Sequence, residues 1–289
     1  MRPTPTSGLL LAALLLLGGC RTDPPVPRAA PTASPVPSPP RPLTITALGD
    51  SYTQGFSSCG RPGDCPTTAW ATGTDPRVRS LLQRLARRTG AQPVGQNLSV
   101  SGSKASALTR QAVRAAATQA DLVVVLIGVN DVCTRDVASM TPVPRFRADL
   151  ERALGVLDRT SPRARLLVLS VPDLGRMGDL GRPVAAARAV WARHGICPPV
   201  FGRQADRAAT DARRRQFDVV LHAVCAERPR CTWDDGALGR LRFGRTFLSP
   251  DWFHPSLQGQ TQIAEVAEQT LVRAGVVGPA GVEPALGRP

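Results

Sequence analysis

Four short apolar runs, separated by longer amphipathic stretches, constrain the fold of this chain most strongly. The runs occupy residues 43–48, 94–100, 121–128 and 165–171, and the third contains Leu-Val-Val-Val-Leu-Ile. Continuous runs rich in β-branched residues are typical of parallel strands buried on both faces. Predicted helices lie between and after them, at residues 77–89, 103–119, 143–160, 182–193, 204–227 and 258–274. The alternation predicts a single α/β domain over residues 43–275.

Strands and helices that alternate in this way form one doubly wound, mostly parallel sheet, because crossovers between parallel strands are right-handed. Ligands of such sheets bind at the carboxyl ends of the strands. The first run ends abruptly at Gly49-Asp50-Ser51, with Gly55 shortly after. We therefore expect Ser51 to lie at the edge where a ligand would bind.

The first 19 residues have the pattern of an export signal. An apolar run at residues 9–17 follows Arg2, and it is too short to span a bilayer. The sequence Leu17-Gly-Gly-Cys20 resembles a bacterial lipobox, whose cysteine becomes the lipidated first residue of the mature protein. We expect anchoring on the outer face of the cytoplasmic membrane through Cys20. The alternative is an ordinary cleaved signal with an incidental cysteine and a secreted protein.

Residues 20–42 form a proline-rich linker, and residues 276–289 form a second Gly/Pro-rich stretch that we expect to be a flexible tail. Proline removes a backbone donor and favours extended polyproline geometry. A linker of this kind spans roughly 60 Å when extended. It would hold the domain away from a membrane surface.

The formal charge of +14 does not predict a nucleic-acid partner. The arginines are scattered through the predicted helices, Lys104 is the only lysine, and aromatic residues make up only 4% of the chain. No basic block with interleaved aromatics and no zinc-finger spacing is present. We interpret the charge as compositional bias, with attraction to an anionic envelope or lipid surface as the alternative.

Six cysteines follow Cys20, an even number that favours disulfides in an exported chain. The count alone allows fifteen pairings. Local spacing suggests Cys59–Cys65 and Cys225–Cys231, which leaves Cys133–Cys197. Loop entropy gives the first about 2.4 kcal/mol and the last about 4.3 kcal/mol. Metal binding is the alternative, but the pairs do not have the Cys-x-x-Cys spacing of a metal site.

A serine nucleophile needs a histidine that takes its proton and an acid that orients this histidine. The chain has three histidines. His194 lies at a predicted helix end and His222 inside a predicted helix, positions that need no catalytic role. His254 lies in Asp251-Trp-Phe-His254-Pro255, before the final helix. One turn can bring Asp251 to the imidazole Nδ1 and leave Nε2 free for Ser51. An Asp/His surface turn is the alternative.

Acyl transfer also needs donors for the developing oxyanion. Gly102 follows the second strand, and a glycine there allows a close approach of its backbone N–H. Asn130 follows the third strand and can donate from its side-chain amide. Together with the N–H of Ser51, three donors are predicted at three strand ends. A loop glycine and a turn-forming asparagine are the alternatives for each residue taken alone.

Taken together, these blocks resemble those of the SGNH (GDSL) hydrolase superfamily. Gly49-Asp50-Ser51, Ser101-Gly102, Gly128-Val-Asn130-Asp131 and Asp251-Trp-Phe-His254 occur in the family's order. The resemblance implies a flavodoxin-like α/β/α sandwich with a five-stranded sheet. It implies Ser51 as nucleophile, His254 as base, Asp251 as its orienter, and Ser51, Gly102 and Asn130 as the oxyanion hole.

The cysteine layout is similar to that of exported bacterial phospholipase B-like lipases and esterases of this superfamily. In related secreted lipases with three disulfides the pairs run sequentially, which supports the pairing above. Tyr52 departs from the commonest family start, and no consequence for the chemistry is expected. The Gly-x-Ser-x-Gly elbow of α/β-hydrolases is absent from the chain.

The resulting hypothesis is a serine ester hydrolase, a monomer that needs no metal and no organic cofactor. Its expected substrate is a lipid ester, either a phospholipid or an acylglycerol, or the ester of a small molecule. A carbohydrate acetyl-esterase is the alternative within the enzyme class. The alternative outside the enzyme class is a non-catalytic lipoprotein that binds the cell envelope. Residues 238–248 and 176–183 are expected to be loops at the rim of the site.

Overall fold

The computed structural model describes residues 42–278. The predicted export signal, Cys20, nearly all of the proline-rich linker and most of the predicted tail lie outside the described residues. The described part is built around one five-stranded sheet in which every pair of neighbouring strands is parallel. The strands are β1 (Thr44–Gly49), β2 (Val94–Asn97), β3 (Leu122–Leu126), β4 (Arg165–Val168) and β5 (Cys231–Trp233).

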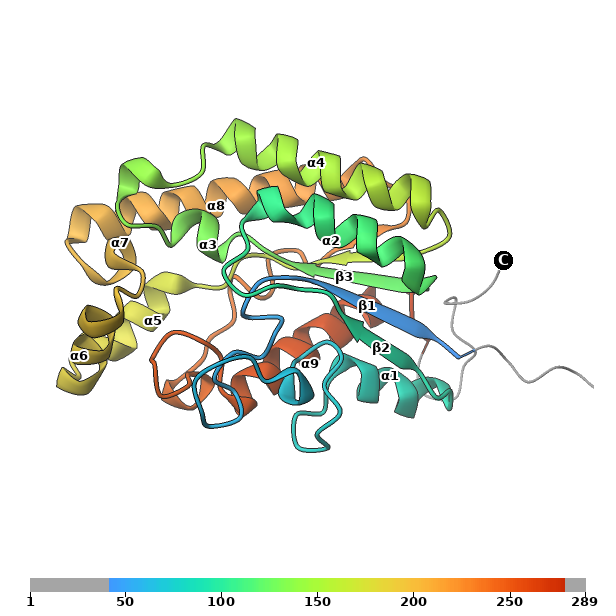
Figure 1. The fold of residues 1–289 in the computed structure, drawn as a ribbon, viewed down its shortest axis with the longest axis horizontal. Coiled ribbons are helices and arrows are strands. Elements are labelled where there is room, and N and C mark those ends of the chain that lie inside the picture. Colours follow the sequence, from blue (N-terminus) through green and yellow to red (C-terminus); the bar gives the residue numbers. More distant parts are fainter. Residues whose placement is uncertain (1–41, 279–289) are drawn as a thin grey trace, which may run out of the picture. The chain divides into compact units, whose positions relative to one another are not determined.

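The strand order β2-β1-β3-β4-β5 is that of flavodoxin-like folds. The helices are α1 (Leu81–Thr89), α2 (Leu108–Ala115), α3 (Val129–Val132), α4 (Val143–Thr160), α5 (Leu174–Gly181), α6 (Ala185–His194), α7 (Pro198–Phe201), α8 (Gln204–Ala226) and α9 (Leu257–Arg273). Figure 1 shows α2, α4 and α8 over one face of the sheet and α1 and α9 over the other. The predicted α/β/α sandwich is confirmed.

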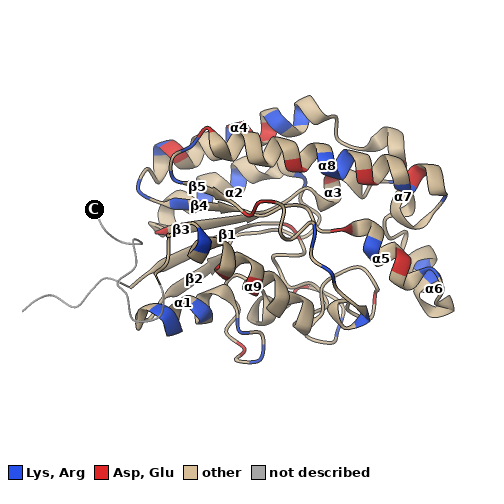
Figure 2. Ribbon diagram, turned by 180° about the vertical axis from the view of Figure 1, so that it is seen from behind, with Lys and Arg blue, Asp and Glu red and all other residues tan. Residues whose placement is uncertain are grey.

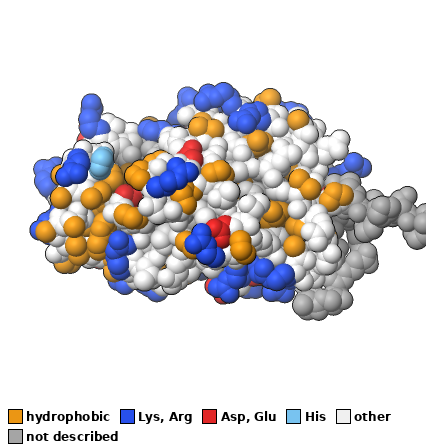
Figure 3. Space-filling model, turned by 60° about the horizontal axis from the view of Figure 1, so that its bottom comes forward, with side chains coloured by type: hydrophobic (Ala, Val, Ile, Leu, Met, Phe, Trp, Pro, Cys, Tyr) orange, Lys and Arg blue, Asp and Glu red, His pale blue; other side chains and the backbone are white. Residues whose placement is uncertain are grey.

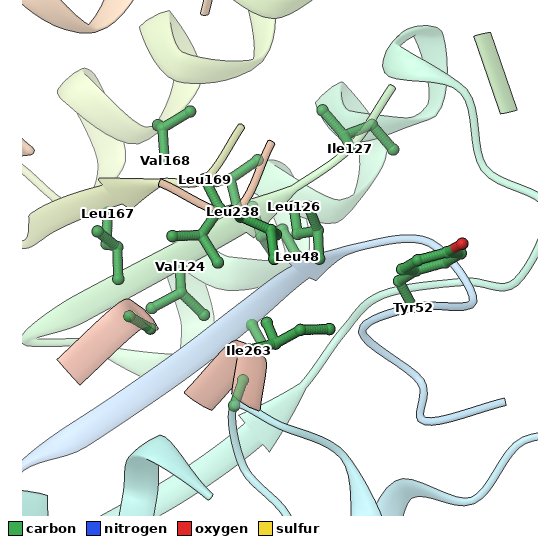
Figure 4. Packing of buried hydrophobic residues seen from close by; sticks show 14 of the residues in the cluster. Leu48, Tyr52, Val124, Leu126, Ile127, Leu167, Val168, Leu169, Leu238 and Ile263 are labelled. Atoms are coloured by element: carbon green, nitrogen blue, oxygen red, sulfur yellow. The ribbon is translucent and has the colours of Figure 1, made fainter. Parts of the chain in front are cut away.

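The core lies on both faces of the two central strands. All five residues of β3 are buried, and β1 is buried after its first residue. In Figure 4, Leu48, Val124 and Leu167 project from neighbouring strands, and Ile263 of α9 lies against the sheet. Burial of apolar surface at about 25 cal/mol per Å² makes this layer the main source of stability. It holds the ends of β1 and β3 in fixed positions.

Capping residues explain where two helices begin. Ser80 and Gln83 form a reciprocal capping box, so α1 begins at Leu81 and not at the predicted residue 77. The Oγ of Ser256 accepts a hydrogen bond from the N–H of Gly259, so α9 begins at Leu257, directly after His254 and Pro255. The start of α9 therefore marks the end of the segment that carries Asp251 and His254.

Several other elements differ from the sequence prediction. Strand β2 ends at Asn97 and not at the predicted residue 100, although the N–H groups of Leu98 and Val100 still donate to carbonyls of β1. The helix expected at 103–119 is α2, with short 3-10 turns on either side. Strand β5 was not located in the sequence, because it has only three residues and none of them is fully buried.

Residues 176–183 were predicted to be a rim loop, and this is wrong for most of them, because α5 covers Leu174–Gly181. Asp173 caps the helix by accepting from the N–H of Arg176. Gly181 is required by a close approach, since a Cβ there would lie 2.3 Å from the ring of Trp191. Figure 1 shows α5, α6 and α7 together at one end of the sheet, on the left.

Three disulfides tie the surface segments together: Cys59–Cys65, Cys133–Cys197 and Cys225–Cys231. The second joins the end of α3 to the start of α7, and the third joins the end of α8 to β5. Within residues 42–278, none of the helices is both long and apolar enough to cross a bilayer.

Candidate active site

Ser51 lies in a tight turn directly after β1. The carbonyl of Asp50 accepts hydrogen bonds from the N–H groups of both Thr53 and Gln54. Gly49 has a φ of 146°, and a Cβ there would lie 2.2 Å from the carbonyl oxygen of Leu126. Only glycine permits this approach between the ends of β1 and β3. The chain therefore turns sharply at the sheet edge, with Ser51 on the turn.

His254 and Asp251 lie beside Ser51, although more than 200 residues separate them in sequence. The Nε2 of His254 is 3.0 Å from the Oγ of Ser51, and its Nδ1 is 2.8 Å from Oδ2 of Asp251. Both distances are within hydrogen-bond range. The structure thus brings the three predicted residues into one series, with the imidazole between the hydroxyl and the carboxylate.

The second oxygen of Asp251 holds the turn that carries the histidine. Oδ1 accepts from the N–H groups of Phe253 and His254, each at 2.9 Å. Burial alone raises the pKa of Asp251, but its hydrogen bonds with His254 and the charge of that ring lower the pKa below its ordinary value. Asp251 therefore stays ionised and keeps Nδ1 protonated, which leaves Nε2 as the acceptor.

The three predicted oxyanion donors follow three neighbouring strands, because β1 lies between β2 and β3. Gly102 has a φ of 80° with open space around its Cα, and Asn130 lies in the first turn of α3. Neither the N–H of Ser51 nor that of Gly102 donates to any described residue. The amide of Asn130 donates one hydrogen to the carbonyl of Ser103, at 3.0 Å, and its second hydrogen is left for a ligand.

Gln111 of α2 links the nucleophile turn to the Gly102 loop, a role that the sequence did not reveal. Its side chain is buried and bonds both backbone groups of Gly49, at 2.8 and 2.9 Å. The same amide donates to the Oγ of Ser103 at 3.2 Å. A buried polar residue on an amphipathic helix was the available signal, since buried amides are normally paired.

The role of Tyr52 was also missed by the sequence analysis, which expected this residue to have no consequence for the chemistry. Its ring is fully buried, and its hydroxyl donates to the carbonyl of Phe253 at 2.8 Å and approaches the sulfur of Met177 at 3.4 Å. Figure 4 shows it beyond the end of the sheet strands. Tyr52 thus connects the turn of Ser51 to the turn of His254.

Two buried carboxyl groups lie beneath the site. The pKa of Asp50 is raised to about 7, mainly by burial and also by the nearby charge of Asp131, against the lowering effect of the hydrogen bond from the N–H of Tyr52. Burial also raises the pKa of Asp131. One oxygen of Asp50 is buried without a hydrogen-bond partner. Both groups accept from backbone N–H groups, Asp131 from that of Ala105 at 2.9 Å, and so order the turns around the site.

The other histidines lie away from this series. His194 is the last residue of α6 and is exposed, and His222 is exposed on α8, as the sequence indicated for both. The described residues contain no group of three or more His, Cys, Asp or Glu side chains arranged to hold a metal ion. Two disulfides flank the site, since Cys59–Cys65 closes the loop after Ser51 and Cys133 follows Asn130 by three positions.

Comparisons with known proteins gave one family match. Residues 47–262 match the model of the GDSL-like lipase/acylhydrolase family. No curated protein matched the chain.

Similar solved structures share the fold at low sequence identity. TesA has a TM-score of 0.53 at 20% identity, covering 80% of this chain and 99% of its own. An extracellular lipase from Streptomyces rimosus has a TM-score of 0.51 at 18% identity, covering 79% and 99%. A family two carbohydrate esterase from Clostridium thermocellum, in complex with cellohexaose, has a TM-score of 0.51 at 15% identity, covering 82% and 66%.

Proposed function

The chain belongs to the GDSL-like lipase/acylhydrolase family, and on that premise we propose that it is a serine carboxylic ester hydrolase. Ser51 is the nucleophile, His254 the general base, and Asp251 the residue that orients the base. One observation carries this proposal: a continuous hydrogen-bonded series, 3.0 Å from Ser51 to His254 and 2.8 Å from His254 to Asp251. These are the contacts that proton transfer from the hydroxyl requires.

In the proposed reaction, the Oγ of Ser51 attacks the ester carbonyl carbon while Nε2 of His254 takes the hydroxyl proton. The tetrahedral intermediate collapses, the bond to the alcohol oxygen breaks, and His254 gives its proton to the leaving alcohol. Water then attacks the acyl-enzyme through the same base, releasing the acid and restoring Ser51. The ionised Asp251 stabilises the imidazolium that forms in both halves of the cycle.

The oxyanion of each intermediate is proposed to rest on three donors: the N–H groups of Ser51 and Gly102 and the amide of Asn130. Two of these N–H groups have no acceptor among the described residues, and Asn130 has one hydrogen to spare. Donors that are oriented before the reaction need no reorganisation as charge develops. Gln111 supports this arrangement by tying Gly49 to Ser103.

We propose a lipid ester, either a phospholipid or an acylglycerol, as the substrate class. The similarity to exported phospholipase B-like enzymes and the expected lipid anchor on Cys20 support this class. Figure 3 shows apolar side chains gathered among basic ones at the end of the molecule that carries α5 and α6. Exposed alanines of α6 contribute apolar surface at that end: Ala185, Ala186, Ala189 and Ala192. Such a surface suits an amphiphilic substrate.

The proposed location is outside the cytoplasm. Three disulfides within residues 42–278 support an oxidising compartment. The proposed organisation of the chain is an export signal over residues 1–19, a linker over 20–42, the hydrolase domain over 43–275 and a tail over 276–289. The domain would then act as a monomer held near the membrane by Cys20.

Hydrolysis of p-nitrophenyl butyrate tests the reaction. Ser51→Ala is expected to lower kcat by about 10⁴-fold or more, because it removes the hydroxyl that is hydrogen-bonded to Nε2 of His254. Ser139→Ala, which changes an exposed serine outside the series, should leave kcat unchanged. A wild-type protein that is folded yet no faster than Ser51→Ala would instead support the non-catalytic envelope-binding role.

A rate series tests the substrate class. It would compare p-nitrophenyl esters of two to twelve acyl carbons, phosphatidylglycerol vesicles and acetylated cello-oligosaccharides. The proposal predicts that kcat/KM rises with acyl length and that vesicles are hydrolysed. A maximum at the acetyl ester, with turnover of the acetylated sugars, would contradict it in favour of a carbohydrate acetyl-esterase.

Fractionation of cells tests the anchor. The wild-type chain is expected in the membrane fraction with a mass increase from lipid on Cys20. Cys20→Ser should release it in soluble form or leave the export signal uncleaved. Wild-type protein that is soluble and starts at another residue would favour the ordinary cleaved signal.

A further inference from the structure

A polar hollow of about 510 Å³ lies beside α5, outside the series of Ser51, His254 and Asp251. Its walls come from α5, from the first three turns of α8 and from the segment that follows β5. Seven arginines and three aspartates line it, a net of four positive charges (7 − 3). In Figure 2 basic positions are seen on α5, on α8 and on a loop between them.

The three carboxylates of the hollow already have partners. Asp179 pairs with Arg182, and Asp211 pairs with both Arg214 and Arg215. Asp173 is used differently, since its Oδ1 caps α5 by accepting from a backbone N–H. The acids therefore neutralise only part of the positive charge around the hollow.

Four guanidinium groups of the hollow have no carboxylate partner among the described residues: Arg176, Arg207, Arg240 and Arg242. Arg176 donates one hydrogen bond to the carbonyl of Phe243, at 3.0 Å, and Arg207 donates one to that of Gly202, at 2.7 Å. These backbone contacts hold the two side chains in place and leave most of their N–H groups free, because a guanidinium has five donors. The side chains of Arg240 and Arg242 make no hydrogen bond with any residue in 42–278.

The chemistry of this lining selects one class of ligand. Its uncharged residues are one glutamine, one alanine and two glycines, so it offers an acyl chain none of the large apolar side chains that such a chain packs against. Guanidinium forks match the oxygens of a phosphate group and bind it through charge-assisted pairs. A hollow of this size holds more than one bare ion. We propose that it is a binding site for the phosphate group of an organic phosphate, either a lipid head group or a soluble phosphate ester.

The hollow is separate from the catalytic series but close to it. Arg176 lines the hollow, and the next residue on α5, Met177, approaches the hydroxyl of Tyr52 at 3.4 Å. Helix α5 therefore borders the hollow and also contacts the turn that carries Ser51 and Tyr52. Binding there is independent of the proposed ester hydrolysis, and its test does not use activity.

Calorimetric titration with sn-glycerol 3-phosphate tests the site, using the full chain with Cys20→Ser so that no lipid is attached. Wild type is expected to bind one equivalent. Arg240→Ala/Arg242→Ala should weaken this binding at least about tenfold, because both side chains are exposed and make no side-chain hydrogen bond that the fold would lose. The matched control is Arg110→Ala/Arg114→Ala, which removes the same charge from exposed positions of α2 and should change binding less than about twofold.

Vesicle flotation distinguishes the two sources of phosphate. The ligand is a lipid head group if wild type and the α2 control bind phosphatidylglycerol vesicles and Arg240→Ala/Arg242→Ala does not. The ligand is instead a soluble phosphate ester if all three proteins bind vesicles equally and only Arg240→Ala/Arg242→Ala loses binding of sn-glycerol 3-phosphate. Absence of saturable glycerol phosphate binding by wild type, or an equal loss in the α2 control, would overturn the proposal.

Discussion

At the scale of single residues, the site depends on side chains that hold the catalytic turns. Tyr52 is buried between the turns of Ser51 and His254, and its hydroxyl donates to the carbonyl of Phe253. Gln260 of α9 makes a related link, since its amide donates to the carbonyl of Tyr52 at 3.0 Å and its oxygen accepts from Trp70. These contacts hold the two turns in position and so set the distance between Nε2 of His254 and the Oγ of Ser51.

Tyr52→Phe is expected to lower kcat about three- to tenfold with little change in KM, because one hydrogen bond is worth about 1 kcal/mol. The ring and its packing remain, so the melting temperature should shift little. Thr46→Val is the matched control, since it also removes a buried hydroxyl, which bonds to Thr118, but away from the site. A kcat loss as large in Thr46→Val would show that Tyr52 has only a structural role.

The buried carboxyl of Asp50 predicts how stability depends on pH. Burial raises its pKa from 3.8 to about 7 in the folded protein, so the folded state binds a proton more tightly than the unfolded state. Stability from this group is therefore lost as the pH rises from about 4 to about 7. Asp50→Asn keeps an acceptor for the N–H of Tyr52 and should remove the contribution of this group to the pH dependence of the free energy of unfolding.

Urea unfolding at pH 5, 6, 7 and 8 measures the effect as the difference between wild type and Asp50→Asn. The variant should gain stability relative to wild type as the pH rises. Asp235→Asn, at an exposed position, is the control and should leave the slope unchanged. A difference that stays constant over this range would contradict the assignment.

At the scale of elements, three strand ends supply the proposed oxyanion hole, and α3 begins where β3 ends. Asn130→Ala is expected to lower kcat by about 10²–10³-fold with a small change in KM, since the lost donor acts on the transition state. Asn97→Ala removes the other asparagine amide near the site, which donates to the carbonyl of Thr53 at 2.7 Å. It should cost stability but change kcat far less, and an equal loss would contradict the role of Asn130.

The Cys133–Cys197 disulfide joins α3 to α7 across 64 positions. Its removal by Cys133→Ser/Cys197→Ser is expected to lower the free energy of unfolding by about 4.3 kcal/mol, from loop entropy. Cys225→Ser/Cys231→Ser removes a disulfide that spans only 6 positions and should cost about 2.4 kcal/mol. Urea unfolding under non-reducing conditions compares the two, and a reversed order would contradict this account.

Elements with strong local patterns were predictable from the sequence. Strands β1 and β3 read as continuous apolar runs because both faces are buried, and α4 begins and ends at the predicted residues 143 and 160. Strand β5 is an edge strand of three half-buried residues and carries no such pattern. Helix α5 contains three glycines, which disfavour a helix locally, and its packing against Trp191 requires one of them.

The site was predictable only where its chemistry demands particular residue types. Ser51, His254 and Asp251 are distinctive because few side chains can serve as nucleophile, base and orienter. Tyr52 and Gln111 act through contacts with residues 201 and 62 positions away in sequence, so no local pattern could reveal their partners. Their roles follow from tertiary packing alone.

At the scale of the whole molecule, the described residues form a cross-linked α/β domain in which α5 borders the proposed phosphate site and contacts Tyr52 beside the proposed ester site. The net charge of +14 was interpreted as compositional bias. The hollow shows that part of this charge is arranged around a space that can hold an anion. The arrangement of arginines, and not their number, is what points to a ligand.

The central claim is that Ser51 is a nucleophile activated by His254. Peptide mapping by mass spectrometry after treatment with a fluorophosphonate tests it most directly, because this reagent forms a stable adduct only with an activated serine. We predict one adduct per chain, on the peptide that contains Ser51, and none in Ser51→Ala or His254→Ala. An unlabelled wild-type protein, or an adduct that persists in Ser51→Ala, would contradict the account.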